Sequence, residues 1–332
     1  MAHSLFYEYA ITPDVFHGDY INSDVRLEII LSELLKGIRD NGMIANLNKD
    51  GWLKFILNDR LPTIMSPRFK EKLIPYLNTL HDRHLLVRHP KSTHENPSTD
   101  LEWLQIALES HRQIKFDGII APNHSLDICE TSCSEFIDAL QVLDSPHWSS
   151  RRKTLTLPPC EPYYRPVLDP VLRHARKLTI VDPFFSPHSA RFTNFLKICA
   201  EQMGKRGQSV LKGQIIIHAG NPEKKSDIHS EPIDNRLDAW EAKIKSMFTS
   251  SIPHKFTIFL RDQILGGKRF HDRFILTDQC CIDIPLGTDV GYDSTPDSTT
   301  WSLLDYEDMQ QKAQEIQPEM KIYKTLGERL II

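Results

Sequence analysis

The chain has 332 residues, enough for two domains or one large one. Its hydrophobic fraction of 40% and charged fraction of 25% are ordinary for a soluble globular protein. The net charge of −4 argues against a protein that coats nucleic acid without specificity, although it leaves room for a local basic groove.

The chain start and the cysteines both favour a cytoplasmic location. No basic segment followed by a long apolar run opens the chain, and no stretch reaches the roughly 18 apolar residues of a membrane span. The cysteines form no C-x-x-C pair, so neither a zinc site nor a disulfide framework is predicted. We therefore expect reduced thiols and no membrane span.

The first half alternates between short apolar segments and amphipathic ones, which predicts an α/β domain over residues 1–145. Thr99 and Asp100 have the pattern of a capped helix start, and Ser66 with Pro67 opens another helix. The predicted strands cover residues 9–11, 43–47, 85–88 and 118–122, and the predicted helices cover residues 23–39, 66–81 and 99–111.

Two acidic residues stand at the ends of these elements. Asp14 follows the first predicted strand, and Asp100 begins the helix that precedes the last one. This order resembles PIN-like nuclease domains over about residues 5–140. The resemblance implies that Asp14 and Asp100 hold Mg²⁺ or Mn²⁺, which activates water for attack on a phosphodiester. Weaker candidates for the same site are Glu102, Asp117 and Asp127. Aspartate is also a common helix cap and loop residue, and this structural interpretation stays open.

A segment rich in proline, serine and basic residues covers 146–165, which predicts a linker to a second domain at 166–332. In that domain, strands are predicted at 177–181, 214–218 and 256–260, with helices at 190–202 and 234–248 between them. Two such β-α steps predict a second α/β domain with a mainly parallel sheet.

The most informative pattern of the second half is H-x-R-x-x-x-x-D, formed by His271, Arg273 and Asp278. Short apolar runs flank it, so we expect it on a hairpin. Residues two apart in a strand point to the same face, which would put the imidazole beside the guanidinium. An imidazole beside a fixed cation can hold a phosphate and attack it.

This pattern is one residue type away from the H-x-K-x-x-x-x-D signature of the phospholipase D superfamily. Gly287 and Thr288, followed by a Ser/Thr-rich segment, occupy the place of that family's Gly-Ser-x-Asn turn. The chain resembles the divergent, single-motif members over about residues 166–304. Such members occur in bacterial conflict systems and in the membrane-binding domain that follows an MIT domain. The resemblance implies a phospholipase D-like half-fold with the motif on a C-terminal hairpin.

The resemblance also implies roles for the residues. His271 would attack phosphorus, Arg273 would neutralise the non-bridging oxygens, and Asp278 would orient an imidazole. A second histidine would protonate the leaving oxygen, supplied by a homodimer partner or by His218 or His229. Further phosphate-binding candidates are Thr288, Ser294, Thr295 and His218. This route needs no cofactor. In the structural alternative, His271 is a surface histidine paired with Asp272 or Asp278.

Three departures from the family pattern matter: arginine replaces lysine, Asp289 and its neighbours replace the usual asparagine turn, and only one complete motif is present. The prediction is a two-domain phosphodiesterase or nuclease that acts on DNA or RNA. The family context adds an antiviral defence effector, as a homodimer or as a subunit of a defence complex. The alternatives are an inactive module that binds phosphate backbones or anionic lipid headgroups through Arg273, and a scaffold subunit of a larger complex.

Overall fold

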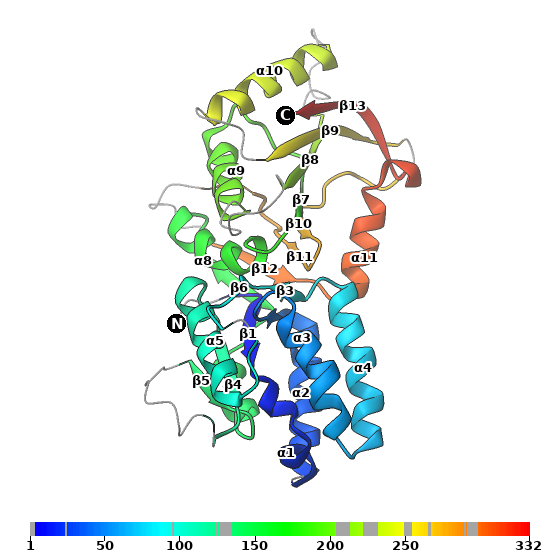
Figure 1. Ribbon diagram of the computed structural model, residues 1–332. Coiled ribbons are helices and arrows are strands. Elements are labelled where there is room, and N and C mark those ends of the chain that lie inside the picture. The colour runs from blue at the N-terminus through cyan, green and yellow to red at the C-terminus, as the bar shows by residue number, and fades with distance from the viewer. Residues whose placement is uncertain are drawn as a thin grey trace. The chain divides into compact units, whose positions relative to one another are not determined.

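The computed structural model describes residues 4–23, 25–94, 96–123, 125, 135–203, 213–221, 232–248, 254–264, 267–288, 290 and 298–332. The chain divides into two units, coloured in sequence order in Figure 1. The N-terminal unit comprises residues 6–152, and the C-terminal unit comprises residues 153–332 with the first five. Each unit contains a β-sheet and helices, so the protein is mixed α/β.

The N-terminal unit has a five-stranded sheet in the order β3-β2-β1-β4-β5, and all of its strand pairs are parallel. Both β1 and β4 are buried along their whole length, as expected where helices cover both faces of a parallel sheet. The strands are β1 (Tyr7–Ile11), β2 (Gly42–Asn46), β3 (Leu86–Arg88), β4 (Gly118–Ala121) and β5 (Phe136–Asp138).

The strand order reverses at β1. From β1 the chain builds outward through β2 to β3, and then crosses back to place β4 on the other side of β1. The junction of β1 and β4 is therefore the topological switch point, where ligands of open α/β sheets bind at the carboxyl ends of the strands. The crossover helices are α2 (Val25–Asn41), α4 (Pro67–Asp82) and α5 (Asp100–Gln113).

Capping residues set the starts of two of these helices. The Ser66 hydroxyl accepts a hydrogen bond from Phe69 N (3.2 Å) at the start of α4. At the start of α5, Thr99 accepts from Glu102 N, and the Glu102 carboxylate accepts from Thr99 N, which makes a capping box. Both predicted helix starts are confirmed.

Short helical turns complete the N-terminal unit. The 3-10 turn η1 (Pro13–Phe16) and α1 (Gly18–Ser23) follow β1, and α3 (Gly51–Phe55) follows β2. A π-helical turn, η2 (Ile56–Arg60), and a 3-10 turn, η3 (Leu61–Thr63), then lead to α4. These turns leave no periodic signal in the sequence because each is shorter than one full amphipathic repeat.

Residues 146–165, for which the sequence predicts a linker, contain regular structure. They include α7 (Pro146–Ser149), β6 (Thr154–Leu157) and the first turn of α8 (Glu161–Leu172). Two of its prolines, Pro146 and Pro162, stand in the first turns of helices, where proline is well tolerated. Strand β6 alternates between exposed and buried residues, as an edge strand with one solvated face does.

The C-terminal unit has an eight-stranded sheet in the order β13-β9-β8-β7-β10-β11-β12-β6. Only the β7-β8 and β8-β9 pairs are parallel, and the other pairs are antiparallel. The expectation of a mainly parallel sheet is therefore wrong for this unit. The strands are β7 (Lys177–Asp182), β8 (Gln214–Gly220), β9 (Lys255–Gln263), β10 (Phe274–Thr277), β11 (Cys281–Asp283), β12 (Thr299–Leu303) and β13 (Tyr323–Ile331).

The connections explain the difference. Parallel neighbours need a crossover, and α9 (Ala190–Met203) and α10 (Ile233–Met247) provide one for each parallel pair. Three residues join β10 to β11, which permits only a hairpin. Helix α11 (Tyr306–Glu315) packs through Met309 on the buried residues Val181 and Phe274 of this sheet.

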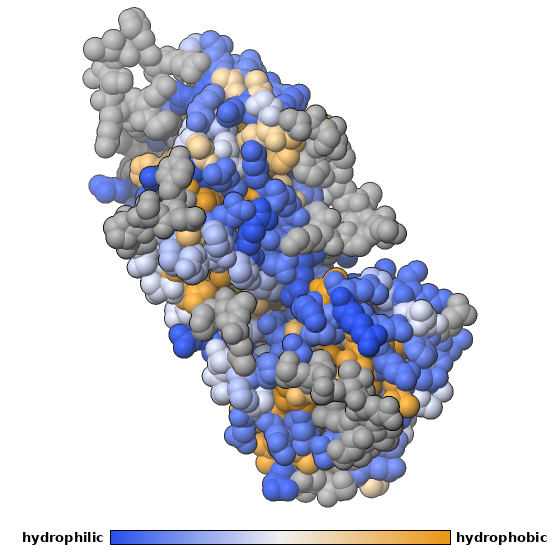
Figure 2. Space-filling view, turned by 90° about the vertical axis from the view of Figure 1, so that its left-hand side faces the viewer, coloured by the Kyte–Doolittle hydropathy of each residue, from blue (hydrophilic) through white to orange (hydrophobic). Residues whose placement is uncertain are grey.

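The face shown in Figure 2 is mostly hydrophilic, with smaller hydrophobic areas between the polar side chains. Among the described residues, no helix combines the length and the hydropathy that are required to span a bilayer.

Candidate functional site

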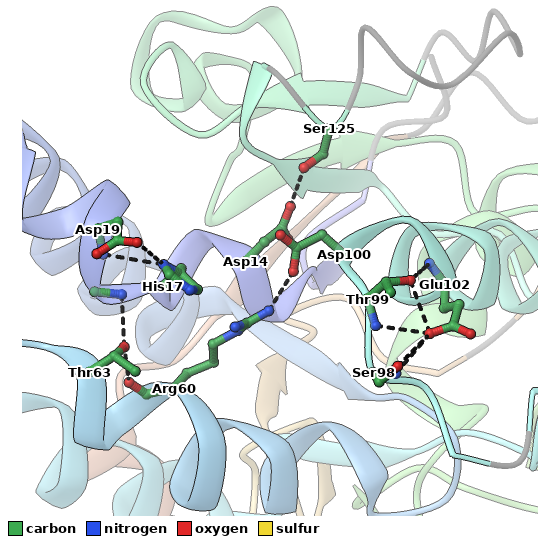
Figure 3. Close-up of polar contacts among 11 residues, drawn as sticks. Asp14, His17, Asp19, Arg60, Thr63, Ser98, Thr99, Asp100, Glu102 and Ser125 are labelled. Atoms are coloured by element: carbon green, nitrogen blue, oxygen red, sulfur yellow. Dashed lines mark hydrogen bonds and ion pairs between the residues drawn. The ribbon is translucent and has the colours of Figure 1, made fainter.

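Asp14 and Asp100, the two predicted metal ligands, lie next to each other in the N-terminal unit (Figure 3). Asp14 stands in η1, three residues after the end of β1, and Asp100 is the first residue of α5. Ser125, which follows β4, contacts Asp14 from the other side of the switch point. The fold thus brings together two carboxylates that are far apart in the sequence, at the edge of the sheet where ligands are expected.

The Asp14 carboxylate is almost completely buried, with 1% exposure. Its Oδ2 accepts a hydrogen bond from the Ser125 hydroxyl, whereas its Oδ1 is buried and accepts none among the described residues. Burial raises the pKa of Asp14, hydrogen bonds from the Ser125 and Thr12 hydroxyls oppose this, and the nearby charge of Asp100 raises it further. A buried carboxylate oxygen without a donor is costly, and a cation is one partner that would satisfy it.

Asp100 is more accessible than Asp14, with 35% side-chain exposure. Its Oδ1 pairs with the guanidinium of Arg60, which reaches the site from η2 (Figure 3). The capping box formed by Thr99 and Glu102 fixes the helical turn that carries Asp100. The site thus contains two carboxylates and an arginine that is paired with one of them.

The other acidic candidates lie elsewhere. The Glu102 carboxylate turns back to accept from Ser98 N and Thr99 N, which lowers its pKa to about 2, so it serves the helix cap. Asp117 precedes β4 and accepts from Glu8 N (2.7 Å), which places it at the opposite edge of the sheet. Asp127 is outside the described residues.

A second buried polar pair in this unit has no signal in the sequence. The Glu8 carboxylate on β1 lies 2.6 Å from Nε2 of His89, and both side chains are fully buried. The Phe116 ring packs edge-on against the imidazole at 5.0 Å between centroids. A single carboxylate inside an apolar strand could not be matched with a histidine 81 residues later without the fold.

In the C-terminal unit, the H-x-R segment directly precedes β10, so it is not part of the strand. The His271 side chain is 65% exposed, and its Nδ1 lies 3.1 Å from an Asp272 oxygen. The other Asp272 oxygen binds Lys312 on α11 at 2.5 Å. The surface pairing of His271 with Asp272, which the structural alternative named, is therefore present.

Arg273 points toward the end of β7. Its Nε lies 3.8 Å from the buried Asp182 carboxylate, and its NH1 donates to Pro285 O (2.5 Å). The guanidinium also lies 4.6 Å from the ring centroid of Phe184, whose side chain is 60% exposed. The sequence analysis singled out neither Asp182 nor Phe184. The signal that could have found them is the end of β7, because Asp182 is its last residue and Phe184 comes two residues later.

Asp278 lies at the other end of β10 from His271. Its carboxylate accepts from Arg176 N (3.0 Å), just before β7 begins. Because β10 runs antiparallel to β7, Arg273 is at the end of β7 and Asp278 is at its start. The structure thus brings Asp278 together with neither His271 nor Arg273.

The phosphate-binding candidates have different surroundings. Thr288 is buried, and both its N and its hydroxyl donate to Asp182, at 2.9 and 3.0 Å. His218 on β8 is buried, accepts from Arg261 Nε (3.1 Å) and stacks on Phe259. Burial and the charge of Arg261 lower the pKa of His218 to about 3, so the ring is neutral near pH 7. Ser294, Thr295 and His229 are outside the described residues.

No protein-family model matches this chain, and no curated protein is significantly similar to it. The resemblances to PIN-like domains and to the phospholipase D superfamily rest on the sequence motifs alone. Of the predicted site residues, Asp14 and Asp100 form the pair that the fold assembles at a switch point.

Proposed function

We propose that the N-terminal unit hydrolyses phosphodiester bonds of nucleic acid with a divalent cation bound by Asp14 and Asp100. The observation that carries the proposal is the buried Oδ1 of Asp14, which has no hydrogen-bond partner among the described residues. Carboxylate oxygens are the ligands that Mg²⁺ and Mn²⁺ prefer. The position at the carboxyl ends of β1 and β4 is where such sheets bind ligands.

The donor set fits a cation of this kind. Asp14 supplies an oxygen that is already desolvated, and Asp100 supplies one that remains partly open to solvent. A bound divalent ion would polarise a phosphate oxygen and lower the pKa of water at this place. The hydroxyl of Ser125 keeps the Asp14 carboxylate in position by its hydrogen bond.

The reaction needs no covalent intermediate on the protein. A water oxygen bonds to phosphorus while the P–O ester bond breaks, and one proton of the water ends on the leaving oxygen. The products are a phosphate monoester and an alcohol. The contribution of this chain is to hold charge and orientation, since carboxylates and the Arg60 guanidinium surround the place where charge develops.

The test uses the full chain with short fluorescent single strands of DNA and of RNA. Cleavage is expected with Mn²⁺ or Mg²⁺ and not with excess EDTA. Asp14→Asn and Asp100→Asn should each reduce the rate by about 100-fold or more, the scale of one lost electrostatic contact in a transition state. Asp117→Asn, at the opposite edge of the sheet, is the matched control and should keep the rate. The proposal is refuted if Asp14→Asn and Asp100→Asn cleave as fast as Asp117→Asn.

The phospholipase D-like route at His271 stays a prediction. Its contacts favour it less, because Asp278 lies at the far end of β10 and the neutral His218 has no proton to give as an imidazolium. Cleavage that persists in EDTA and disappears in His271→Ala would transfer the chemistry to the C-terminal unit.

A second candidate function, binding of single-stranded nucleic acid, is favoured for the C-terminal unit. The exposed ring of Phe184 lies against the Arg273 guanidinium at the end of β7. An aromatic ring backed by a cation is a platform on which a nucleobase stacks. Stacking of this kind favours nucleobases over anionic lipid headgroups, which have no π-face. Under this proposal, the C-terminal unit binds the substrate that the N-terminal unit hydrolyses.

A further inference from the structure

Arg60 occupies an unusual position beside the two carboxylates of the N-terminal unit. It is the last residue of the π-helical turn η2, and its NH2 pairs with Asp100 Oδ1. The guanidinium lies 4.9 Å from the ring centroid of Phe55, and the side chain is 11% exposed. Figure 3 shows it reaching toward Asp100 from the side opposite Ser125.

The hydrogen bonds of Arg60 leave part of its guanidinium unused. Its Nε is buried and donates no hydrogen bond among the described residues. A guanidinium has five donors in a planar fork, so one contact with Asp100 leaves an edge of the fork for another acceptor. The contact with Asp100 is made through NH2.

The backbone around Arg60 is held in a form that supports this geometry. The π-helical turn is a rare conformation that occurs often at functional sites. The hydroxyl of Thr63 donates to Arg60 O (2.7 Å) and closes the turn. The same hydroxyl oxygen accepts from Gly18 N (2.9 Å), which ties the turn to the segment after Asp14. These bonds link the backbone segments that carry Arg60 and Asp14.

We propose that Arg60 binds a non-bridging oxygen of the substrate phosphodiester, and that Asp100 holds its guanidinium in place until the substrate arrives. The inference rests on the proposed function and names a residue and the ligand group that it contacts. A planar fork of donors matches two phosphate oxygens, and its charge offsets the negative charge of the phosphate. Arg60 forms no covalent bond and transfers no proton in this role.

The proposal has opposite consequences for the two ligands of the site. Removal of Arg60 takes a competing cation away from Asp100, so the affinity for a divalent ion stays equal or rises. The same change removes the donor fork, so the affinity for a phosphodiester falls. If Arg60 only kept Asp100 in position, its removal would instead lower the affinity for the divalent ion.

The test measures both affinities in the full chain with Arg60→Gln. Mn²⁺ binding is followed by electron paramagnetic resonance, and binding of the thymidine dinucleotide TpT is followed by calorimetry with Mn²⁺ present. We expect unchanged or tighter Mn²⁺ binding and at least a tenfold weaker binding of TpT. The methylphosphonate analogue of TpT lacks the charged oxygen and should bind wild type and variant equally weakly.

Two further variants complete the test. Arg88→Gln breaks another arginine–aspartate pair of the same unit, with Asp50, on the surface, and should change neither affinity. Arg60→Lys keeps the charge without the fork and should lose part of the TpT affinity, which provides a second reading if Arg60→Gln does not fold.

The outcomes separate this inference from the proposed function. Unchanged TpT affinity in Arg60→Gln overturns the role of Arg60, and so does a loss of Mn²⁺ binding in that variant. If wild-type protein binds no Mn²⁺, the proposed function itself fails, and the role of Arg60 falls with it.

Discussion

The Ser125 hydroxyl donates a hydrogen bond to the Asp14 carboxylate across the junction of β1 and β4. The two residues are 111 positions apart in the chain, and both are buried. This contact fixes one oxygen of the carboxylate and leaves the other without a donor among the described residues. The site is thus prepared for a positively charged partner at the cost of a desolvated charge.

Asp14→Asn is expected to stabilise the metal-free protein near pH 7. The pKa of Asp14 is raised in the folded state, chiefly by burial, so the folded protein binds this proton more tightly than the unfolded chain. The free energy of unfolding that this proton contributes is fully present below the unfolded pKa near 3.8. It is lost as the pH rises through the folded pKa. Urea unfolding of both proteins in EDTA should show a gap that widens from pH 4 upward.

The same experiment with Mn²⁺ provides the control. The cation should raise the free energy of unfolding of the wild type but not that of Asp14→Asn, because binding to the folded state alone is stabilising. If the free energies of unfolding of the two proteins in EDTA change with pH in parallel, ionisation of the Asp14 carboxylate does not destabilise the folded protein.

Thr99→Ala tests whether the cap of α5 positions Asp100. Loss of an N-cap hydroxyl typically lowers the free energy of unfolding by about 1 kcal/mol. Ser66→Ala at the start of α4 is the matched control, because it removes the same kind of cap away from the carboxylate pair. Both variants should be destabilised to a similar degree in urea, but only Thr99→Ala should weaken Mn²⁺ binding. Equal Mn²⁺ affinities of the two variants would show that the cap of α5 does not position Asp100 for metal binding.

His218→Gln tests the buried imidazole of the C-terminal unit. The folded pKa of His218 is lowered to about 3, chiefly by burial, whereas the unfolded value is near 6.5. Stability is therefore present above pH 6.5 and is lost as the pH falls toward 3, by up to about 1.4 kcal/mol per pH unit. The variant should lack this part of the pH dependence in denaturant unfolding.

His188→Gln is the control for that measurement, since His188 is exposed. Its profile should follow that of the wild type. An unchanged profile in His218→Gln would mean that the pKa of His218 is the same in the folded and unfolded protein, so that the folded ring takes up a proton near pH 6.5. Protonation would in turn restore His218 as a candidate general acid.

The sequence predicted four of the five N-terminal strands, the position of Asp14 after a strand and that of Asp100 at a helix start, because these depend on local signals, whereas β5 was not predicted. Strand ends, an N-cap and apolar periodicity are each read from a few neighbouring residues. Arg60 and Ser125 were missed because they enter the site through tertiary contacts, from a short π-helical turn and from the end of another strand. No pattern around either residue distinguishes it from an ordinary surface arginine or loop serine.

The C-terminal unit shows the opposite case, in which a motif was clear but its geometry was not. The spacing of His271 and Arg273 suggested one face of a strand, yet β10 begins only at Phe274. The loop before it turns His271 toward Asp272 and Arg273 toward Asp182. Such directions depend on partners from β7 and α11, which the motif itself does not contain.

Phe184→Ala tests nucleic-acid binding by the C-terminal unit. Stacking of one base on an aromatic ring contributes about 1–3 kcal/mol, so the variant should bind a short single strand roughly 5- to 150-fold more weakly. Fluorescence anisotropy in EDTA measures this affinity without cleavage. Tyr163→Ala removes another exposed aromatic residue of the same unit, on α8, and should bind like the wild type.

Arg273→Ala should weaken binding as well, because its guanidinium lies against the Phe184 ring. If Phe184→Ala and Tyr163→Ala bind alike, the stack of Phe184 and Arg273 has only a structural role, and recognition of nucleic acid must be sought in the N-terminal unit.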